Sequence, residues 1–128
     1  MIPPLHHENF TWETALETVL GATDSERRLR EILATEANIE RHLMALNGIS
    51  SALVTLDIPL PLVGEDTQPP TAVAVLVTTQ DFSPAQGYSL AVIMSRSVGR
   101  LEPENIVIID HYMRPIWDSA MDFGDIDN

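Results

Sequence analysis

The sequence contains no cysteine and no lysine, and both absences exclude classes of protein. Without cysteine there is no disulfide framework, no thiol nucleophile and no cysteine-ligated zinc. All 7 basic residues are arginines, and 19 acidic residues bring the formal net charge to −12. This balance repels phosphate backbones and anionic lipids, so it disfavours nucleic-acid binding and docking on a membrane surface.

Long hydrophobic runs are also absent. No apolar stretch approaches the roughly 20 residues that a membrane-spanning helix needs. The first residues, MIPPLHHENF, lack a basic segment followed by an apolar one, so they do not have the pattern of a signal peptide. With 128 residues, 45% of them hydrophobic, the chain has the size and composition of one folded domain. We expect a soluble chain.

Motifs that carry chemistry are missing as well. The sequence has no glycine-rich phosphate loop, no HExxH and no G-x-S-x-G. His42 and His111 are isolated, and no carboxylate–histidine pattern at helical spacing accompanies His6 and His7. The 19 carboxylates make chance pairs inevitable, so none indicates a general acid. We expect no enzyme, no cofactor and no metal ion, and we interpret His6 and His7 as part of a solvated terminus.

Two segments are predicted in the N-terminal third. Apolar residues within 10–20 indicate either a short amphipathic helix or an irregular packed segment, which Gly21 closes. The second segment is a helix that begins at an N-cap among residues 23–25 and ends at Gly48, where glycine accepts a left-handed conformation. Glu36 interrupts the apolar stripe of this helix. Two interpretations remain open for Glu36: a rim carboxylate that reaches water, and a residue of an interface.

Two strands follow, separated by a proline-rich loop. From Ser51 to Ile58 the side chains alternate between two faces, which is typical of a strand, and Pro59 ends it. A second strand is predicted over 71–79. Three valines share one face of this strand: Val73, Val75 and Val77. Its other face carries small apolar residues, so that face is a further candidate for burial.

The pattern after the second strand predicts another helix and another strand. Ser83 is the N-cap, and the proline after it takes the first helical position. We attribute Gly87, inside this helix, to close packing. Gly99 is predicted to end the helix in a left-handed conformation. The β-branched run 106–109 then predicts a buried strand, which residues 111–117 extend.

The order helix, strand, strand, helix, strand predicts a two-layer α+β domain with two helices on one face of a three-stranded sheet. We place this domain at residues 23–117, after a leader at 1–22 and before an acidic, flexible tail at 118–128. KH-type RNA-binding modules have the same order of elements, but their GXXG loop and basic groove are missing here.

Two long stretches of the chain resemble one known family. The resemblance is to the ring-building domain of the flagellar M-ring protein family (FliF), shared with the inner-ring lipoproteins of type III secretion systems (the SctJ family). Its closing helix and strand resemble SVGRLEPENIVIID, residues 97–110. Its first helix, glycine turn and strand resemble ILATEANIERHLMALNGISSALVTLDIP, residues 32–59. The resemblance covers residues 23–110, and Asp110 after the last strand favours the flagellar side.

Individual positions match the pattern of this family. Glu36 and Arg41 fall on a glutamate and an arginine of its first helix. Further matches lie in the first helix, turn, first strand and closing motif: Ile39, Gly48, Ala52, Val54, Ile58, Pro59, Ser97, Val98, Leu101, Pro103, Glu104 and Asn105. Other positions depart from the family pattern. Leu53 and Thr55 replace more polar residues, and Asn38 replaces a glutamate.

The resemblance implies a structural function. Many copies of such a domain pack side by side, the helical face of one against the sheet edge or face of the next, in the MS ring of the flagellar basal body. It implies self-association, other basal-body proteins as partners and no nucleic acid. Candidate contact residues lie on the first helix, the sheet and the end of the second helix: Glu36, Arg41, Leu53, Thr55, Arg96 and Arg100.

The resemblance also implies a location. The membrane segments of the family lie outside this chain, so we expect an excised domain on the periplasmic side of the bacterial inner membrane. Three alternatives remain open. They are an inner-membrane ring component of a type III secretion system, a related ring protein of sporulation channels, and a free-standing acidic adaptor that binds a basic partner.

Overall fold

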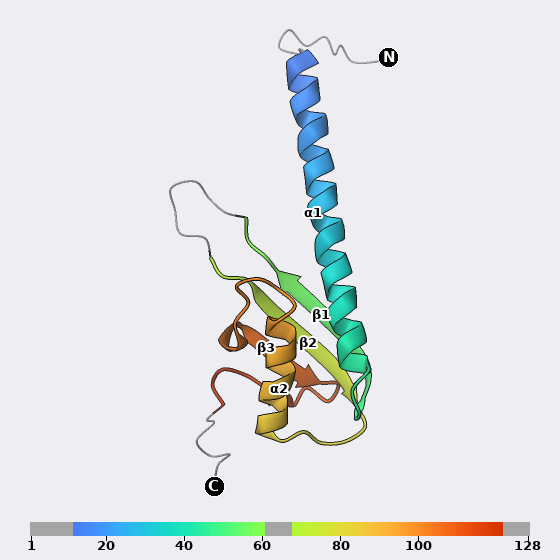
Figure 1. Cartoon of the computed structure of the whole chain (residues 1–128), viewed down its shortest axis with the longest axis vertical. Helices are drawn as coiled ribbons and strands as arrows, with labels where there is room; N and C mark the ends of the chain where they lie inside the picture. Colours follow the sequence, from blue (N-terminus) through green and yellow to red (C-terminus); the bar gives the residue numbers. More distant parts are fainter. Residues whose placement is uncertain (1–11, 61–67, 122–128) are drawn as a thin grey trace. The chain divides into compact units, whose positions relative to one another are not determined.

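The computed structural model describes residues 12–60 and 68–121. Contacts divide the chain into two compact units, Met1–Glu31 and Ile32–Asn128. Helices and strands follow in the order α1 (Trp12–Met44), β1 (Ile49–Asp57), β2 (Thr71–Thr78), α2 (Pro84–Ser95), the 3-10 turn η1 (Pro103–Asn105), β3 (Ile106–Asp110) and β4 (Pro115–Trp117) (Figure 1). No helix in these described ranges is both long enough and apolar enough to cross a bilayer.

Helix α1 is one continuous helix, where the sequence predicted two segments. The predicted stop at Gly21 is wrong, because that residue lies within the helix. A glycine in an exposed helix costs only about 1 kcal/mol relative to alanine, which is too little to break a long helix. Asp24, a predicted N-cap, instead pairs with Arg27 one turn later, with Oδ1 at 2.9 Å from Nη2. The boundary predicted after residue 22 therefore falls inside α1.

The sheet has four strands in the order β1-β2-β3-β4. Strand β1 is antiparallel to β2, β2 is parallel to β3, and β3 is antiparallel to β4. The predicted two-layer α+β class is confirmed, with one strand more than expected. The C-terminal halves of α1 and α2 contribute to the same apolar core as the sheet.

One face of the sheet is covered by the helices. Its buried side chains alternate along three strands: Val54, Leu56, Ala72, Ala74, Leu76, Ile106 and Ile108. They meet Ile39 and Leu43 of α1 and Leu90 and Met94 of α2 in the core. On β2 the small residues are the buried ones, while Val73 and Val77 are exposed. Small side chains on the covered face let a helix approach the sheet closely.

Helix α2 begins as predicted. The side chain of Ser83 accepts a hydrogen bond from the Gln86 N–H, and the Gln86 side chain accepts one from the Ser83 N–H, which forms a capping box. Gly87 is needed for close packing, because a Cβ there would overlap the carbonyl oxygen of Ile116. This contact brings α2 directly against β4.

The end of α2 differs from the prediction. The helix stops at Ser95, four residues before Gly99. The left-handed residue of the following turn is Arg100, with φ of 69°, so the prediction of that conformation for Gly99 is wrong. Gly48, after α1, does adopt a left-handed conformation with φ of 92°, as predicted.

The segment after β3 reverses direction where the sequence predicted a continued strand. A turn at residues 111–114 leads into β4, which pairs with β3 through Ile108 and Trp117. Met113 has φ of 68° in this turn. The Trp117 Nε1–H donates to the carbonyl oxygen of Pro103 at 2.9 Å, so the indole also ties β4 to η1.

Candidate functional site

The helices leave the second face of the sheet open. We call this surface the open sheet face, and it consists of side chains from β1, β2 and β3: Leu53, Thr55, Val73, Val75, Val77, Val107 and Ile109. All but Thr55 are apolar, and the exposed polar residues Ser51, Asp57 and Thr71 continue the same side of the sheet at its ends. The two-residue period of a strand puts these positions on the side opposite to the core.

The open sheet face is continuous across the strands. Leu53 pairs with Val75, and Val75 pairs with Ile109, so three apolar side chains form one row. Leu53 is 62% exposed and Val73 is 44% exposed. Single exposed apolar residues are common, but a contiguous group on one face makes that surface a candidate for contact with another molecule.

Helix α1 also exposes apolar side chains. Trp12 and Leu16 are one helical turn apart, and so are Leu29 and Leu33. All four are more than half exposed. Leu29 and Leu33 were predicted within the apolar stripe of the helix, yet both are exposed.

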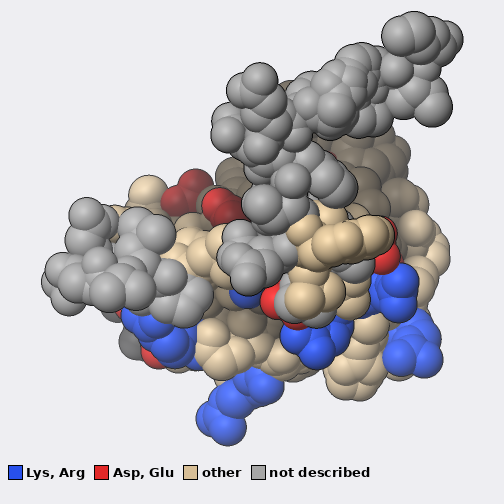
Figure 2. Space-filling view, turned by 90° about the horizontal axis from the view of Figure 1, so that it is seen from above, with Lys and Arg blue, Asp and Glu red and all other residues tan. Residues whose placement is uncertain are grey.

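Arginines accompany these apolar surfaces without forming one basic patch. On the face seen in Figure 2 their side chains make several separate groups. Arg41 is exposed near the end of α1 and donates from Nη2 to Asn38 Oδ1 at 3.1 Å. Arg96 and Arg100 are exposed in the turn that follows α2. Dispersed guanidinium groups can supply a polar rim to an apolar contact.

Glu36 and Glu40 occupy the outer edge of β1. Oε2 of Glu36 accepts a hydrogen bond from the Leu56 N–H at 2.8 Å, and Oε2 of Glu40 accepts one from the Val54 N–H at 2.9 Å. Glu36 is half-buried, and the structure gives its carboxylate a partner that neither interpretation of the sequence included. Its oxygen satisfies the backbone of an edge strand.

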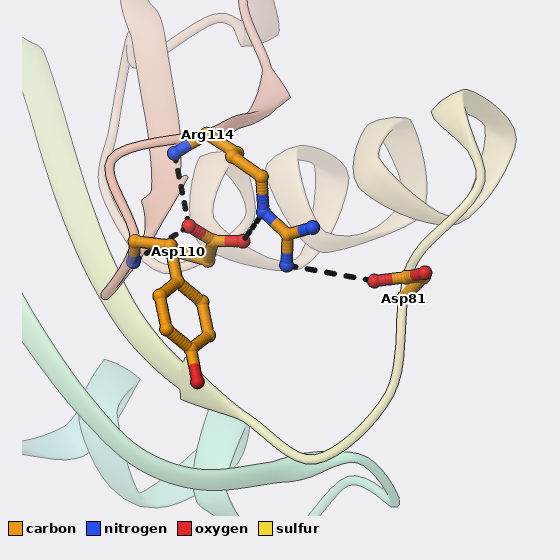
Figure 3. Close-up of polar contacts among 4 residues, drawn as sticks. Asp81, Asp110 and Arg114 are labelled. Carbon is orange, nitrogen blue, oxygen red and sulfur yellow. Dashed lines mark hydrogen bonds and ion pairs between the residues drawn. The ribbon is translucent and has the colours of Figure 1, made fainter.

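A second polar cluster holds the turn between β3 and β4 (Figure 3). Asp110 is only 4% exposed. Its Oδ1 accepts hydrogen bonds from the N–H groups of Tyr112 and Arg114 at 2.8 and 2.9 Å, and its Oδ2 accepts from Arg114 Nε at 2.9 Å. Nη2 of Arg114 also lies 3.5 Å from Oδ1 of Asp81, a residue that precedes α2. These contacts tie the turn between β3 and β4 to the segment before α2.

The hydrogen bonds to Asp110 change its acidity. Burial by itself raises the pKa of the Asp110 carboxyl. The N–H groups of Arg114 and Tyr112 and the Arg114 guanidinium oppose this, and together they hold the pKa below its ordinary value of 3.8. Asp110 is therefore charged in the folded protein at neutral pH.

The structure distributes the six predicted contact residues over three places. Leu53 and Thr55 lie together on the open sheet face. Arg96 and Arg100 lie together after α2, and Glu36 and Arg41 lie on α1. Sequence reasoning missed Glu40, although its spacing of four residues from Glu36 was visible. No cluster of three or more metal-ligating side chains occurs in the described part of the chain, and His6 and His7 lie outside it.

Comparison with protein families gives one match over most of the chain. Residues 13–116 match the family described as "Secretory protein of YscJ/FliF RBM domain". Comparison with curated proteins gives no match.

Solved structures with the same fold come from both branches of that family. The 58–213 fragment of FliF matches with a TM-score of 0.58 and 22% identity, over 66% of this chain and 56% of that one. The type III secretion system protein EscJ of enteropathogenic E. coli matches with a TM-score of 0.56 and 20% identity, over 72% and 54%. The chain thus spans about half the length of these structures.

Proposed function

The chain belongs to the YscJ/FliF family of secretory proteins, whose ring-building domain it contains, and from this membership we propose that copies of it pack side by side into a membrane-associated ring. Its function is structural. The flagellar MS ring is the first candidate assembly, with the domain on the periplasmic side of the inner membrane.

The open sheet face is the observation that carries this proposal. A contact that uses one surface of each copy and a different surface of the next is heterologous, and it closes into a ring when its rotation allows. The open sheet face supplies one such surface. The exposed leucines of α1, Leu29 and Leu33, supply apolar side chains for the other surface on the next copy.

The face of the sheet is favoured over its edges for this contact. At one edge, Glu36 and Glu40 already accept the hydrogen bonds of two β1 amides. At the other edge, β4 has three residues and begins with Pro115, which has no N–H to donate. We therefore keep Leu53 and Thr55 as central contact residues.

The substitution Leu53→Glu tests the proposal. It places a charge on the open sheet face, and we expect it to weaken self-association by about tenfold or more, as for a central interface residue. Leu60→Glu is the matched control, because Leu60 is 61% exposed against 62% for Leu53 but lies outside the sheet. Sedimentation equilibrium at high protein concentration measures both. Equal association of the two variants would contradict the proposed contact.

The arginines are proposed as the polar rim of the same contact. Arg41→Glu reverses an exposed charge whose hydrogen bond to Asn38 stays within α1. We expect this variant to keep the circular-dichroism spectrum and unfolding midpoint of the wild type while its association weakens. If it unfolds instead, Arg41 is needed for the fold and does not belong to the rim.

The type III secretion ring is the alternative assembly, since FliF and EscJ both share the fold. Electron microscopy of membranes from cells that express the complete reading frame tests ring formation. We expect rings of uniform diameter that disappear when residues 23–110 are deleted. Loss of motility or loss of protein secretion in the same deletion strain then identifies the machine. If the complete product is dispersed and forms no rings, the proposal is overturned.

A further inference from the structure

Strand β1 lies at an edge of the sheet, so half of its backbone groups point away from β2. An exposed edge of this kind is a template on which a strand of another molecule can pair. β1 has nine residues, with no proline and one charged side chain, Asp57, at its end. Long, uncharged edge strands without proline are those most prone to such pairing.

Helix α1 covers this edge through two glutamates one helical turn apart. The C-terminal half of α1 runs beside β1 (Figure 1). Four helical residues rise about 6 Å, and two strand residues span about 6.7 Å, so the two repeats nearly match. Glu36 and Glu40 can therefore reach two successive outward N–H groups, those of Leu56 and Val54, at 2.8 and 2.9 Å. Charged acceptors make such hydrogen bonds stronger than neutral ones.

We propose that Glu36 and Glu40 close the edge of β1 against antiparallel pairing with β1 of a second copy, and so direct association to the open sheet face. The second copy is the natural competitor because antiparallel pairing of one strand with itself is two-fold symmetric. Such an isologous dimer is closed and adds no further copies. It would remove subunits from a ring.

Only the statement that association is directed to the open sheet face rests on the proposed function. The closing of the edge follows from hydrogen bonds within one chain and holds whether or not the protein builds a ring. The two statements can therefore fail separately, and the experiment keeps them apart by working in a Val107→Glu background, which charges the open sheet face on β3 and leaves the side chains of β1 unchanged.

The test compares two double substitutions in that background. Glu36→Ala with Glu40→Ala removes both acceptors and keeps a strong helix former at each position. Glu36→Gln with Glu40→Gln removes the same two charges but keeps a side-chain oxygen that can accept. We expect the alanine variant to dimerise with a dissociation constant at least about tenfold lower than that of the glutamine variant, as measured by sedimentation equilibrium. Equal dispersion of both folded variants would overturn the proposal.

Amide hydrogen exchange gives a second readout that remains available if the double alanine variant does not fold. At low protein concentration, Glu36→Ala should speed exchange at Leu56 by about tenfold and leave Val54 nearly unchanged, because one charged hydrogen bond is lost. Glu40→Ala should do the reverse. Unchanged exchange at both amides in both single variants would show that the glutamates do not guard the edge.

The association measured for these variants separates the proposed ring contact from the proposed role of the glutamates. If Leu53→Glu leaves association unchanged while the alanine pair in the Val107→Glu background still produces dimers, the proposed ring contact fails and the role of the glutamates stands. If Leu53→Glu weakens association and the alanine pair adds no dimer in that background, the ring contact stands and the edge proposal fails.

Discussion

Asp110 shows how one buried carboxylate fixes a turn. It accepts hydrogen bonds from Tyr112 N–H, Arg114 N–H and Arg114 Nε, and its pKa lies below the ordinary value of 3.8. A lowered pKa in the folded state means that the folded protein prefers the charged form more than the unfolded chain does. The stabilisation is therefore complete above pH 3.8 and is lost as the pH falls through the folded-state pKa below it.

Asp110→Asn should destabilise the fold at neutral pH, because the amide keeps acceptor oxygen for the backbone but loses the charge that holds Arg114. We expect the difference in free energy of unfolding from wild type to shrink in acid below pH 3.8, where the wild-type carboxyl also becomes neutral. Urea titrations at several pH values measure this difference. Asp57→Asn, at an exposed carboxylate, is the control, and a difference independent of pH would contradict the assignment.

Glycine is required at position 87 because the backbone of Ile116 lies against it, and its φ angle is one that other residues adopt as well. An alanine Cβ would meet the carbonyl oxygen of Ile116, part of the backbone of β4, which cannot turn aside as a side chain can. We expect Gly87→Ala to destabilise the protein by about 1–3 kcal/mol, as overpacking does, despite the better helix propensity of alanine. Urea unfolding measures the change in the free energy of unfolding. A variant more stable than wild type would mean that the backbone of β4 moves aside at little cost.

At the scale of elements, Gly21 offers the opposite case within α1. In the described part of the chain, a Cβ built there meets no atom within 4 Å apart from its own chain neighbours and helix backbone, so helix propensity is the main change on substitution. Gly21→Ala should therefore favour the helix by about 1 kcal/mol. We expect a stronger circular-dichroism signal at the helical minimum and no change in the core. An unchanged signal would indicate that α1 does not depend on this position.

The sequence predicted those elements whose signals are local. Ser83 with its following proline marked the start of α2, and the β-branched run 106–109 marked β3. The sequence-based prediction failed for elements that depend on contacts with distant parts of the chain. β4 exists because Trp117 and Ile116 pack on other elements and Asp110 holds the turn, and no local pattern announces this. Gly21 misled for a different reason, because a helix stop signal is only a weak local preference.

The candidate site was predictable to the same extent. Alternation placed Leu53 and Thr55 on one face of a strand, and the structure puts both on the open sheet face. It could not tell which face the helices cover, because both faces of β2 are apolar. The hydrogen bonds of Glu36 and Glu40 to β1 were also beyond a one-dimensional pattern, since they depend on how a helix and a strand align.

At the scale of the whole molecule, charge opposes assembly. Each copy has a formal net charge of −12, so copies packed side by side as proposed would repel one another. An apolar contact through the open sheet face gains from screening of this repulsion. Ion pairs made by Arg41, Arg96 and Arg100 would instead be weakened by salt. The two kinds of contact therefore respond to ionic strength in opposite directions.

Association should tighten when the salt concentration rises from about 0.1 M to about 1 M, because the screening length falls from about 10 Å to about 3 Å. Sedimentation equilibrium across this range measures the dissociation constant. Leu53→Glu adds a further negative charge at the contact, so any association that remains in this variant should depend on salt more steeply than in wild type. Association that weakens with salt would place the arginines, and not the apolar face, at the centre of the contact, since repulsion between acidic copies can only be relieved by screening.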